Sequence, residues 1–360
     1  MIKFRFLPFV TALMVYFIVS GFSPKQKSNV RAMYATVWSV SSAADIDKLL
    51  ETAHKYKFNQ IFFQTRYRGD ALYIANKTDS TYPNNEHLCY TVKDSTFDPL
   101  GYAIEKAKKY HIEIHAWVTV FVVTPHDLWK IKPDHIYYTH PEWLTYNRKG
   151  DSMANNEHEG AFFDAGVPAA KEYFLNVVSD IVRNYDIDGI QFDYIRYPDS
   201  SYGYNPIAME EFKKSGSSNF AKWKQEQLSN FLNILYLQLK HIKPKIQISA
   251  AVIAKRDKAL NKYSQDWMLW LENQNIDRVY LMAYNTSVKT FTELIKQASK
   301  VNQYRRMVLV LRAWPPPNSK YSVAQINEKI KVSKKYHFKN FGFYSYAGMR
   351  DNKYFTGIKF

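Results

Sequence analysis

The sequence has very little cysteine: its 360 residues contain one, Cys89, which rules out an internal disulfide and a cysteine-rich metal site. It also lacks a glycine-rich phosphate loop and a Gly-x-Ser-x-Gly elbow, so the nucleotide-binding folds and the serine hydrolases that depend on these motifs are excluded. The histidines are scattered, and no second ligand stands at zinc-binding spacing from His115. We therefore expect no metal and no cofactor.

Long apolar runs are absent as well, apart from one near the N-terminus. Residues 6–19 follow Lys3 and Arg5 and precede the small residues Ser20 and Gly21, which resembles a secretory signal. No other segment approaches ~20 unbroken apolar residues. We expect export to the periplasm or the extracellular space, with no membrane span beyond this segment. The expected organisation is a signal peptide or uncleaved N-terminal anchor, a linker and a single domain, at residues 1–23, 24–30 and 31–360.

Acidic residues are outnumbered, because 33 Asp and Glu stand against 49 Lys and Arg and give a formal net charge of +16. An exported protein of this charge is expected to meet an anionic wall polymer or a membrane surface rather than nucleic acid, since its basic residues are not gathered in one motif. The alternative is that many lysines, such as Lys106, Lys108 and Lys109, simply solvate helix faces. The oligomeric state cannot be read from the sequence.

Hydrophobic residues make up 46% of the chain and aromatic residues 16%, which is ample for a large core. Apolar periodicity alternates between strand-like and helix-like segments along the chain, and this alternation predicts a (β/α)₈ TIM barrel. An eighth helix would have to fit into residues 351–360, so it is short, absent or replaced by the N-terminal segment. The expected strands are 31–40, 60–66, 112–120, 189–194, 247–253, 279–284, 307–312 and 341–346, and the expected helices are 43–56, 99–110, 168–185, 220–242, 267–275, 290–301 and 323–336.

The fourth expected strand carries the best candidate for chemistry. Ile190 and Phe192 alternate with Gln191 and Asp193, so the polar pair points to one face. In a barrel of parallel strands that face is the interior, and Asp193 then lies near the C-terminal end, where barrel enzymes keep their active sites. We therefore choose Asp193 as the nucleophile or the acid/base. The alternative is an aspartate that only pairs with Arg196 or Arg66.

The connections after the second, third and fourth strands are long, at residues 67–98, 121–167 and 195–219. All three would lie on the C-terminal face and would build the site. They contain aromatic residues, which either bind the apolar faces of sugar rings or pin the loops to the barrel. These residues are Trp129, Tyr137, Tyr138, Trp143, Tyr146, Tyr202 and Tyr204.

Strand alternation carried around the barrel gives an unusually polar set that shares the direction of Asp193. A purely structural barrel interior prefers branched apolar residues, so this set indicates a functional cleft rather than a satisfied polar core. Weaker members stand at the ends of the last two strands, including Tyr344 and Tyr346. The expected substrate-binding residues are Gln64, Arg66, His115, Trp117, Asp164, Gln191, Tyr197, Tyr284, Arg312 and Trp314.

A barrel with cleft aromatics and a carboxylate at a strand end suggests glycoside hydrolysis, which needs two carboxyl groups. The second carboxyl is not obvious from the sequence. Asp70, after the second strand, is our choice for the second catalytic residue, and Asp257 is next. Other candidates by position are Glu157, Glu159, Asp164 and Glu210.

At this point several motifs resemble those of the glycosyl-hydrolase-like 10 family of secreted TIM-barrel proteins. This family includes bacterial enzymes that cut peptidoglycan glycan strands stripped of peptides. The resemblance runs from about Arg31 to the eighth strand and is most specific through the fourth. It rests on residues 59–73 (NQIFFQTRYRGDALY), 115–117 (HAW), 140–143 (HPEW), 163–164 (FD) and 185–198 (YDIDGIQFDYIRYP).

Carried over residue by residue, the resemblance implies a cleft whose lining includes Asp193. Many members have two adjacent Asp at this point, whereas this chain has Asp193 followed by Tyr194, which puts catalysis in question. The pattern also looks like part of a chitinase motif, but the chitinase acid would fall at Ile195 and its middle Asp at Gln191, so that mechanism is excluded. The implied lining residues are Gln64, Arg66, Asp70, His115, Trp117, Asp164 and Asp193.

Two functional hypotheses follow. The first is an exported glycoside hydrolase that cleaves O-glycosidic bonds of a cell-envelope or environmental polysaccharide, with peptide-free peptidoglycan glycan as one candidate. The second is a non-catalytic barrel that binds glycans, suggested by the missing second acid beside Asp193. In both, the partner is a polysaccharide or glycan strand.

Overall fold

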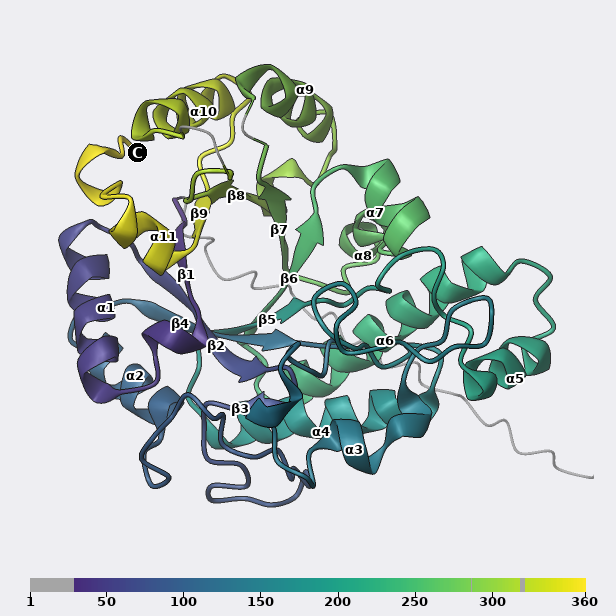
Figure 1. The fold of residues 1–360 in the computed structure, drawn as a ribbon. Helices are drawn as coiled ribbons and strands as arrows, with labels where there is room; N and C mark the ends of the chain where they lie inside the picture. The colour runs from purple at the N-terminus through teal and green to yellow at the C-terminus, as the bar shows by residue number, and fades with distance from the viewer. Residues whose placement is uncertain (1–28, 286, 318–320) are drawn as a thin grey trace, which may run out of the picture.

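The computed structural model describes residues 29–285, 287–317 and 321–360, and within these ranges the chain forms a closed barrel of eight parallel strands surrounded by helices (Figure 1). This confirms the predicted (β/α)₈ fold. The expected signal or anchor at residues 1–23 lies outside the described residues. The barrel strands are β1 Arg31–Ala35, β2 Gln60–Tyr67, β4 Glu113–Thr119, β5 Gly189–Asp193, β6 Gln247–Ile253, β7 Arg278–Ala283, β8 Met307–Arg312 and β9 Phe341–Tyr344.

The barrel closes between its first and last strands. β1 pairs in parallel with β2 on one side and with β9 on the other, so no barrel strand is left with an open edge. The backbone N–H of Val30 also donates to the side chain of Asn340 at 2.8 Å, next to this seam. A short additional strand, β3 Asp70–Ala71, pairs antiparallel with the end of β2.

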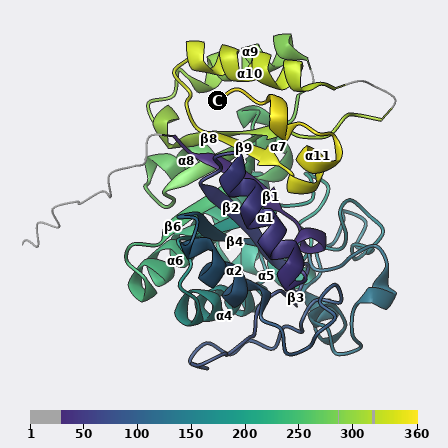
Figure 2. The same cartoon turned by 90° about the vertical axis from the view of Figure 1, so that its left-hand side faces the viewer.

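Helices cover the outside of the barrel, and Figure 2 shows α1 lying across the strands β1 and β2. Polar side chains fix where several of them begin: Ser42, Asp98 and Asn219 accept hydrogen bonds from backbone N–H groups of the first turn. No described helix is both long and apolar enough to cross a membrane. The covering helices are α1 Ala43–Lys55, α2 Pro99–Lys108, α4 Pro168–Asn184, α6 Phe220–Ile242, α8 Trp267–Glu272, α9 Val288–Ala298, α10 Val323–Lys335 and α11 Tyr346–Asp351.

The ends of the chain differ from the prediction. The first strand stops at Ala35 instead of continuing to residue 40, because residues Val37–Ser39 form a 3₁₀ turn. The eighth helix begins at Tyr346, inside the predicted last strand, and ends at Asp351, so residues 352–360 contain only the 3₁₀ turn Phe355–Gly357. Helices that were not predicted lie inside the connections: α3 Ile136–Thr139, α5 Pro206–Lys214 and α7 Arg256–Tyr263.

The hydrophobic core has two parts. A large shell of buried side chains lies between the strands and the helices, and a smaller column fills the barrel interior, where Tyr34, Phe62, Trp117 and Tyr280 pack together. Polar side chains share this column, and some of them form hydrogen bonds with one another. The Tyr280 hydroxyl donates to the Gln60 side chain at 2.6 Å, for example. The interior is therefore packed along its length, as expected for a barrel of this size.

His115 belongs to the deeper part of this column. Its Nε2 lies 2.6 Å from the Gln60 amide nitrogen, and its ring packs against Gly189 on the neighbouring strand. A Cβ on Gly189 would lie 2.2 Å from His115 Nδ1 and 2.8 Å from the backbone oxygen of Gln247. Glycine at this position thus makes room for the imidazole.

Gly189→Ala is expected to lower the free energy of unfolding by about 1–3 kcal/mol, because the added methyl group overpacks the barrel interior. Gly342→Ala is the matched control. Gly342 also faces the interior, from β9, but there the added Cβ would meet its nearest neighbour, Val310, at 3.4 Å. Urea unfolding of both variants measures the difference, and equal stabilities would contradict the role given to His115.

Candidate active site

Asp193 is the last residue of β5 and lies inside the barrel at its C-terminal end. Its Oδ2 accepts a hydrogen bond from Trp117 Nε1 at 3.1 Å, and its Oδ1 accepts one from the backbone N–H of Tyr194 at 2.8 Å. Burial raises the pKa of Asp193 to about 6, against the lowering effects of these hydrogen bonds and of Arg196. Within the described residues Asp193 forms no ion pair, so the purely structural pairing with Arg196 or Arg66 is absent.

The backbone turns sharply directly after this carboxylate. Tyr194 has a φ of 55°, in the left-handed region that few non-glycine residues adopt. This conformation points the Tyr194 N–H at the Asp193 carboxylate. The Tyr194 ring packs against Phe162 and lies 5.0 Å from the guanidinium of Arg196. Tyr194 is thus part of the packing around the carboxylate.

Aromatic rings surround Asp193 on the barrel side. Trp117 makes edge-to-face contacts with Tyr34 at 5.3 Å and with Tyr344 at 5.9 Å, measured between ring centroids. Trp314 continues the cluster, at 5.3 Å from Tyr284 and 5.7 Å from Tyr344. The carboxylate is therefore enclosed by apolar ring surface, which is the physical reason for its raised pKa.

Unpaired polar atoms lie beneath this aromatic cluster. The hydroxyl of Tyr34 and both polar atoms of the Gln191 amide are buried, and none has a well-formed hydrogen bond to a described residue. Burial raises the pKa of Tyr34, and Gln191 lies close enough to lower it. Gln191 lies on β5, two residues before Asp193. Buried polar groups without partners are rare in folded proteins and mark places where a ligand or water completes the bonding.

Glu159 is the carboxylate that the structure brings toward Asp193. It comes from the long loop after β4, and its Oε1 lies 3.4 Å from Arg196 Nη2. Its other oxygen, Oε2, is buried and has no hydrogen-bond partner among the described residues. The charge of Glu159 raises the pKa of Asp193, whereas that of Arg196 lowers it. From the sequence Glu159 was one of several candidates by position, with nothing to rank it.

Arg66 does not share the direction of Asp193, so this expectation is wrong. Gln64 pairs with Trp117 but Arg66 pairs with Val118, which places a β-bulge at Thr65 and reverses the alternation beyond it. The Arg66 side chain therefore points out of the barrel, where its Nε donates to Glu86 Oε1 at 2.6 Å.

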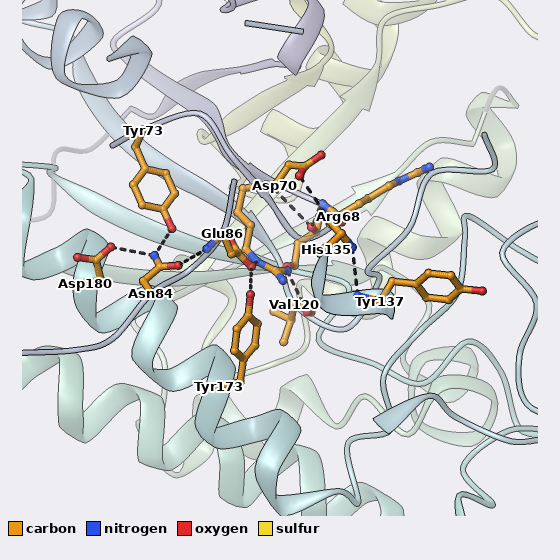
Figure 3. A network of polar contacts seen from close by, with 12 residues as sticks. Arg68, Asp70, Tyr73, Asn84, Glu86, Val120, His135, Tyr137, Tyr173 and Asp180 are labelled. Atoms are coloured by element: carbon orange, nitrogen blue, oxygen red, sulfur yellow. Dashed lines mark hydrogen bonds and ion pairs between the residues drawn. The ribbon is translucent and has the colours of Figure 1, made fainter. Parts of the chain in front are cut away.

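Figure 3 shows the polar network around this pair. Tyr173 of α4 donates its hydroxyl to the same Glu86 oxygen at 2.9 Å, and the backbone N–H of Glu86 donates to Asn84 at 3.0 Å. Asn84 in turn donates to Asp180 of α4 at 2.8 Å. The network ties the loop after β2 to α4.

Asp70 lies beside the same network (Figure 3), in β3, and His135 Nε2 is 3.9 Å from its Oδ1. Burial, with the charge of Glu86, raises the pKa of Asp70 to about 8, against the lowering effects of Arg66 and Lys132. The protonated form of Asp70 is therefore favoured at neutral pH. The charges that act on it belong to the loop network, and those that act on Asp193 are Arg196 and Glu159.

Asp164 and Tyr197 form a separate buried cluster between the third and fourth loops. Asp164 accepts from the hydroxyl of Thr145 at 2.8 Å and from the backbone N–H of Gly166 at 2.8 Å. Its charge raises the pKa of both Tyr197 and Lys224, although burial outweighs this effect for Lys224. These contacts hold the two loops together.

The remaining predicted residues lie around the C-terminal ends of the strands. Gln64 accepts a hydrogen bond from the backbone N–H of Val37 at 3.0 Å, after the end of β1. Arg312 donates to the backbone oxygen of Trp314 at 3.0 Å and lies 4.2 Å from the Trp314 ring. Asp257 is exposed in α7. Among the described residues, no group of His, Cys, Asp and Glu is arranged to hold a metal ion.

Comparison with known protein families and sequences links this barrel to glycosyl hydrolases. A family model described as Glycosyl hydrolase-like 10 matches residues 28–336. The chain is 27% identical over 207 residues to "Glycosyl hydrolase YngK" of Bacillus subtilis and 24% identical over 225 residues to "Glycosyl hydrolase DigH" of Escherichia coli. These matches cover 56% and 59% of this chain but only 38% and 48% of the two relatives, so the chain spans less than half of their length.

Solved structures show the same fold at low sequence identity. The PgaB (BpsB) glycoside hydrolase domain from Bordetella bronchiseptica matches with a TM-score of 0.71 at 13% identity, over 91% of this chain and 97% of that one. Alpha-L-fucosidase isoenzyme 2 from Paenibacillus thiaminolyticus matches with a TM-score of 0.64 at 14% identity, over 91% of this chain and 48% of that one. The barrel is thus shared with both.

Asp70→Asn is expected to reduce the loss of stability between pH 4 and 8. With a folded-state pKa of about 8 against its usual value of 3.8, the folded protein holds a proton that the unfolded chain releases, so the free energy of unfolding falls as pH rises from 4 to 8. Removing this carboxyl group should reduce the decrease in the free energy of unfolding by an amount on the order of a few kcal/mol.

Urea unfolding at a series of pH values measures this change. The control is Asp257→Asn, which removes an exposed aspartate and should keep the wild-type slope. If Asp70→Asn and the wild type lose stability in parallel across the same range, the burial of a protonated Asp70 is ruled out.

Proposed function

The chain belongs to the glycosyl hydrolase-like 10 family, and from this premise we propose that it is an exported glycoside hydrolase that cleaves O-glycosidic bonds of a cell-envelope or environmental polysaccharide. The observation that carries the proposal is Asp193, a buried carboxyl at the C-terminal end of the barrel with a pKa of about 6. Peptide-free peptidoglycan glycan is the first candidate substrate. The N-terminal segment at residues 6–19 supports export.

Asp193 is suited to the role of the general acid. Glycoside hydrolysis needs a carboxyl that holds a proton near neutral pH and gives it to the leaving oxygen. Burial among the neighbouring rings favours the protonated form, as apolar surroundings do for carboxyls in general, and outweighs the hydrogen bond from Trp117, which favours the ionised form. The sugar ring would lie over Asp193, and a second carboxylate would act from its other side.

Asp70 and Glu159 are the two choices for this second carboxylate. Asp70 was the choice from sequence, but its environment favours the protonated form and its charged neighbours are those of the loop network. Glu159 is held by Arg196, and its charge acts directly on Asp193. We therefore propose Glu159 as the nucleophile, or as the base that activates water.

A non-catalytic glycan-binding barrel is the second candidate function. The observation that favours it is Tyr194, which stands where many family members have a second Asp. In that case the aromatic cluster around Trp117 would bind sugar without turnover. The two functions differ in whether oligosaccharide products appear.

Asp193→Asn and Glu159→Gln are each expected to lower turnover by ~10²–10⁴-fold, because each removes a group that transfers a proton or attacks the sugar. The measurement is release of oligosaccharides, by mass, from peptide-free peptidoglycan glycans and from a panel of plant and host polysaccharides. Asp257→Asn serves as the control, since it changes an exposed aspartate outside the site.

The outcomes separate the alternatives. Full activity in Asp193→Asn would refute the proposed mechanism. Loss of activity in Asp70→Asn with full activity in Glu159→Gln would assign the second role to Asp70. Binding of a glycan by wild type and Asp193→Asn alike, with no product from any glycan, would establish the binding barrel.

The value of kcat/KM is expected to fall as the pH rises above 6, because Asp193 must be protonated to act as the acid and its pKa is about 6. The rate should drop about tenfold for each further pH unit. Steady-state kinetics between pH 4 and 9 test this profile. A rate that instead rises through pH 6 would show that Asp193 acts in its ionised form.

A further inference from the structure

A set of aromatic and basic side chains lies at the C-terminal end of the barrel, outside the Asp193 centre. We name it the rim strip. Its members are the last residue of β2 and residues from the segments that follow β1, β2 and β4, which all emerge at this end. They are Trp38, Tyr67, Arg68, Tyr90, Trp129 and Lys130.

Direct contacts join the members of the rim strip in two groups of three. Trp38 packs edge-to-face on Tyr67, with 5.6 Å between the ring centroids. The guanidinium of Arg68 lies 5.0 Å from the Tyr67 ring. Lys130 Nζ lies 5.7 Å from the ring of Tyr90 and 5.4 Å from that of Trp129. Each group therefore combines ring faces with one cation. Burial is the larger cause of the raised pKa of Tyr67, and the two groups lie close enough for the charges of Tyr90 and Lys130 to act on this pKa as well.

The two tryptophans of the strip are unusually exposed. Trp38 has 62% of its surface exposed and Trp129 has 81%. Neither ring can owe its position to burial, since most of its surface remains in water. Large exposed aromatic faces are instead typical of binding surfaces, and an apolar ring face matches the apolar face of a pyranose.

Arg68 is the available cation of the strip. Lys130 is paired with Asp127 at 2.6 Å, which neutralises it. The guanidinium of Arg68 forms no hydrogen bond or ion pair with any described residue, and Figure 3 shows its side chain extending away from Glu86. A guanidinium with all its donors free is well matched to a carboxylate, which it can bind through two parallel hydrogen bonds.

Tyr344 links the strip to the Asp193 centre. Its ring contacts Trp117, the hydrogen-bond partner of Asp193. Burial, Asp193 and Tyr67 raise the pKa of Tyr344 to about 12, while Arg68 lowers it. Tyr344 thus contacts the hydrogen-bond partner of Asp193 and lies within electrostatic reach of Tyr67 and Arg68, which places the near end of the strip close to the Asp193 centre.

We propose that the rim strip is a binding subsite for a carboxylate-bearing sugar of the glycan, with Trp38 and Trp129 stacking on sugar rings and Arg68 binding the carboxylate. This inference rests on the proposed glycan substrate and specifies its chemistry as acidic. The net charge of +16 agrees with an anionic polymer as the partner. A lipid surface is a poorer match, because the strip offers flat ring faces at intervals and a single free cation among its described residues.

The test compares two forms of one ligand: peptide-free glycan strands with free carboxylates, and the same strands with the carboxylates reduced to alcohols. Calorimetry in the Asp193→Asn background measures affinity without turnover. Arg68→Gln should weaken binding of the carboxylated strands ~10-fold and abolish their advantage over the reduced strands. Trp129→Ala should weaken both forms alike, by ~5–10-fold, because stacking does not depend on the carboxylate.

Arg305→Gln is the matched control. Arg305 also lies over a tyrosine ring, that of Tyr304 at 5.9 Å, but in the 3₁₀ turn Tyr304–Arg306 that precedes β8, at the opposite end of the barrel. This variant should bind like the parent. Equal loss in Arg68→Gln and Arg305→Gln would reveal unspecific charge attraction and would overturn the subsite. Binding of anionic lipid vesicles that is lost in Arg68→Gln, without glycan binding, would overturn it too.

Kinetics on the active protein keep this inference separate from the proposed function. Arg68→Gln and Trp129→Ala should raise KM and leave kcat nearly unchanged, since the strip binds sugar units away from the cleaved bond. Hydrolysis with an unchanged KM in both variants would refute the strip and preserve the hydrolase. Carboxylate-dependent binding without hydrolysis of any glycan would refute the hydrolase and preserve the strip.

Discussion

A closed barrel of eight strands forces every second strand residue into an interior just wide enough for side chains. Asp193 points into this interior because of its position in the side-chain alternation of β5. There its contacts with water are replaced by the indole N–H of Trp117, one backbone N–H and apolar ring surface. The loss of water costs stability and at the same time shifts the proton affinity of the carboxyl toward neutral pH. The cost in folding stability and the raised proton affinity of Asp193 therefore have the same cause.

Strand periodicity predicted the barrel and the placement of Asp193, Gln191 and Trp117, because alternation is a property of the extended backbone itself. It failed at Arg66, where one extra residue at Thr65 reversed the alternation. Nothing in the local sequence signals this bulge. Glu159 could be named from the sequence but not ranked, since a loop of nearly fifty residues has no periodicity from which its return to the barrel could be inferred.

The cleft residues that the family resemblance implies have two different roles in the structure. Asp193 and Trp117 meet at the barrel end, whereas Arg66 and Asp164 are buried in the polar contacts that shape the long loops. Such buried polar contacts are costly to break and define one loop conformation among many. A motif residue can therefore serve a site by fixing the loops around it, at a distance from the reacting atoms.

The seam between β1 and β9 also governs how the chain reaches this structure. Val30 meets Asn340 across 310 positions of sequence, so the contact that closes the barrel is among the most remote in the chain and carries a high loop-closure cost. Until residues Phe341–Tyr344 are in place, β1 and β8 each keep an unpaired edge. During synthesis the barrel is therefore an open sheet whose unpaired edges can pair with other chains, and the risk of aggregation is greatest just before the last strand forms.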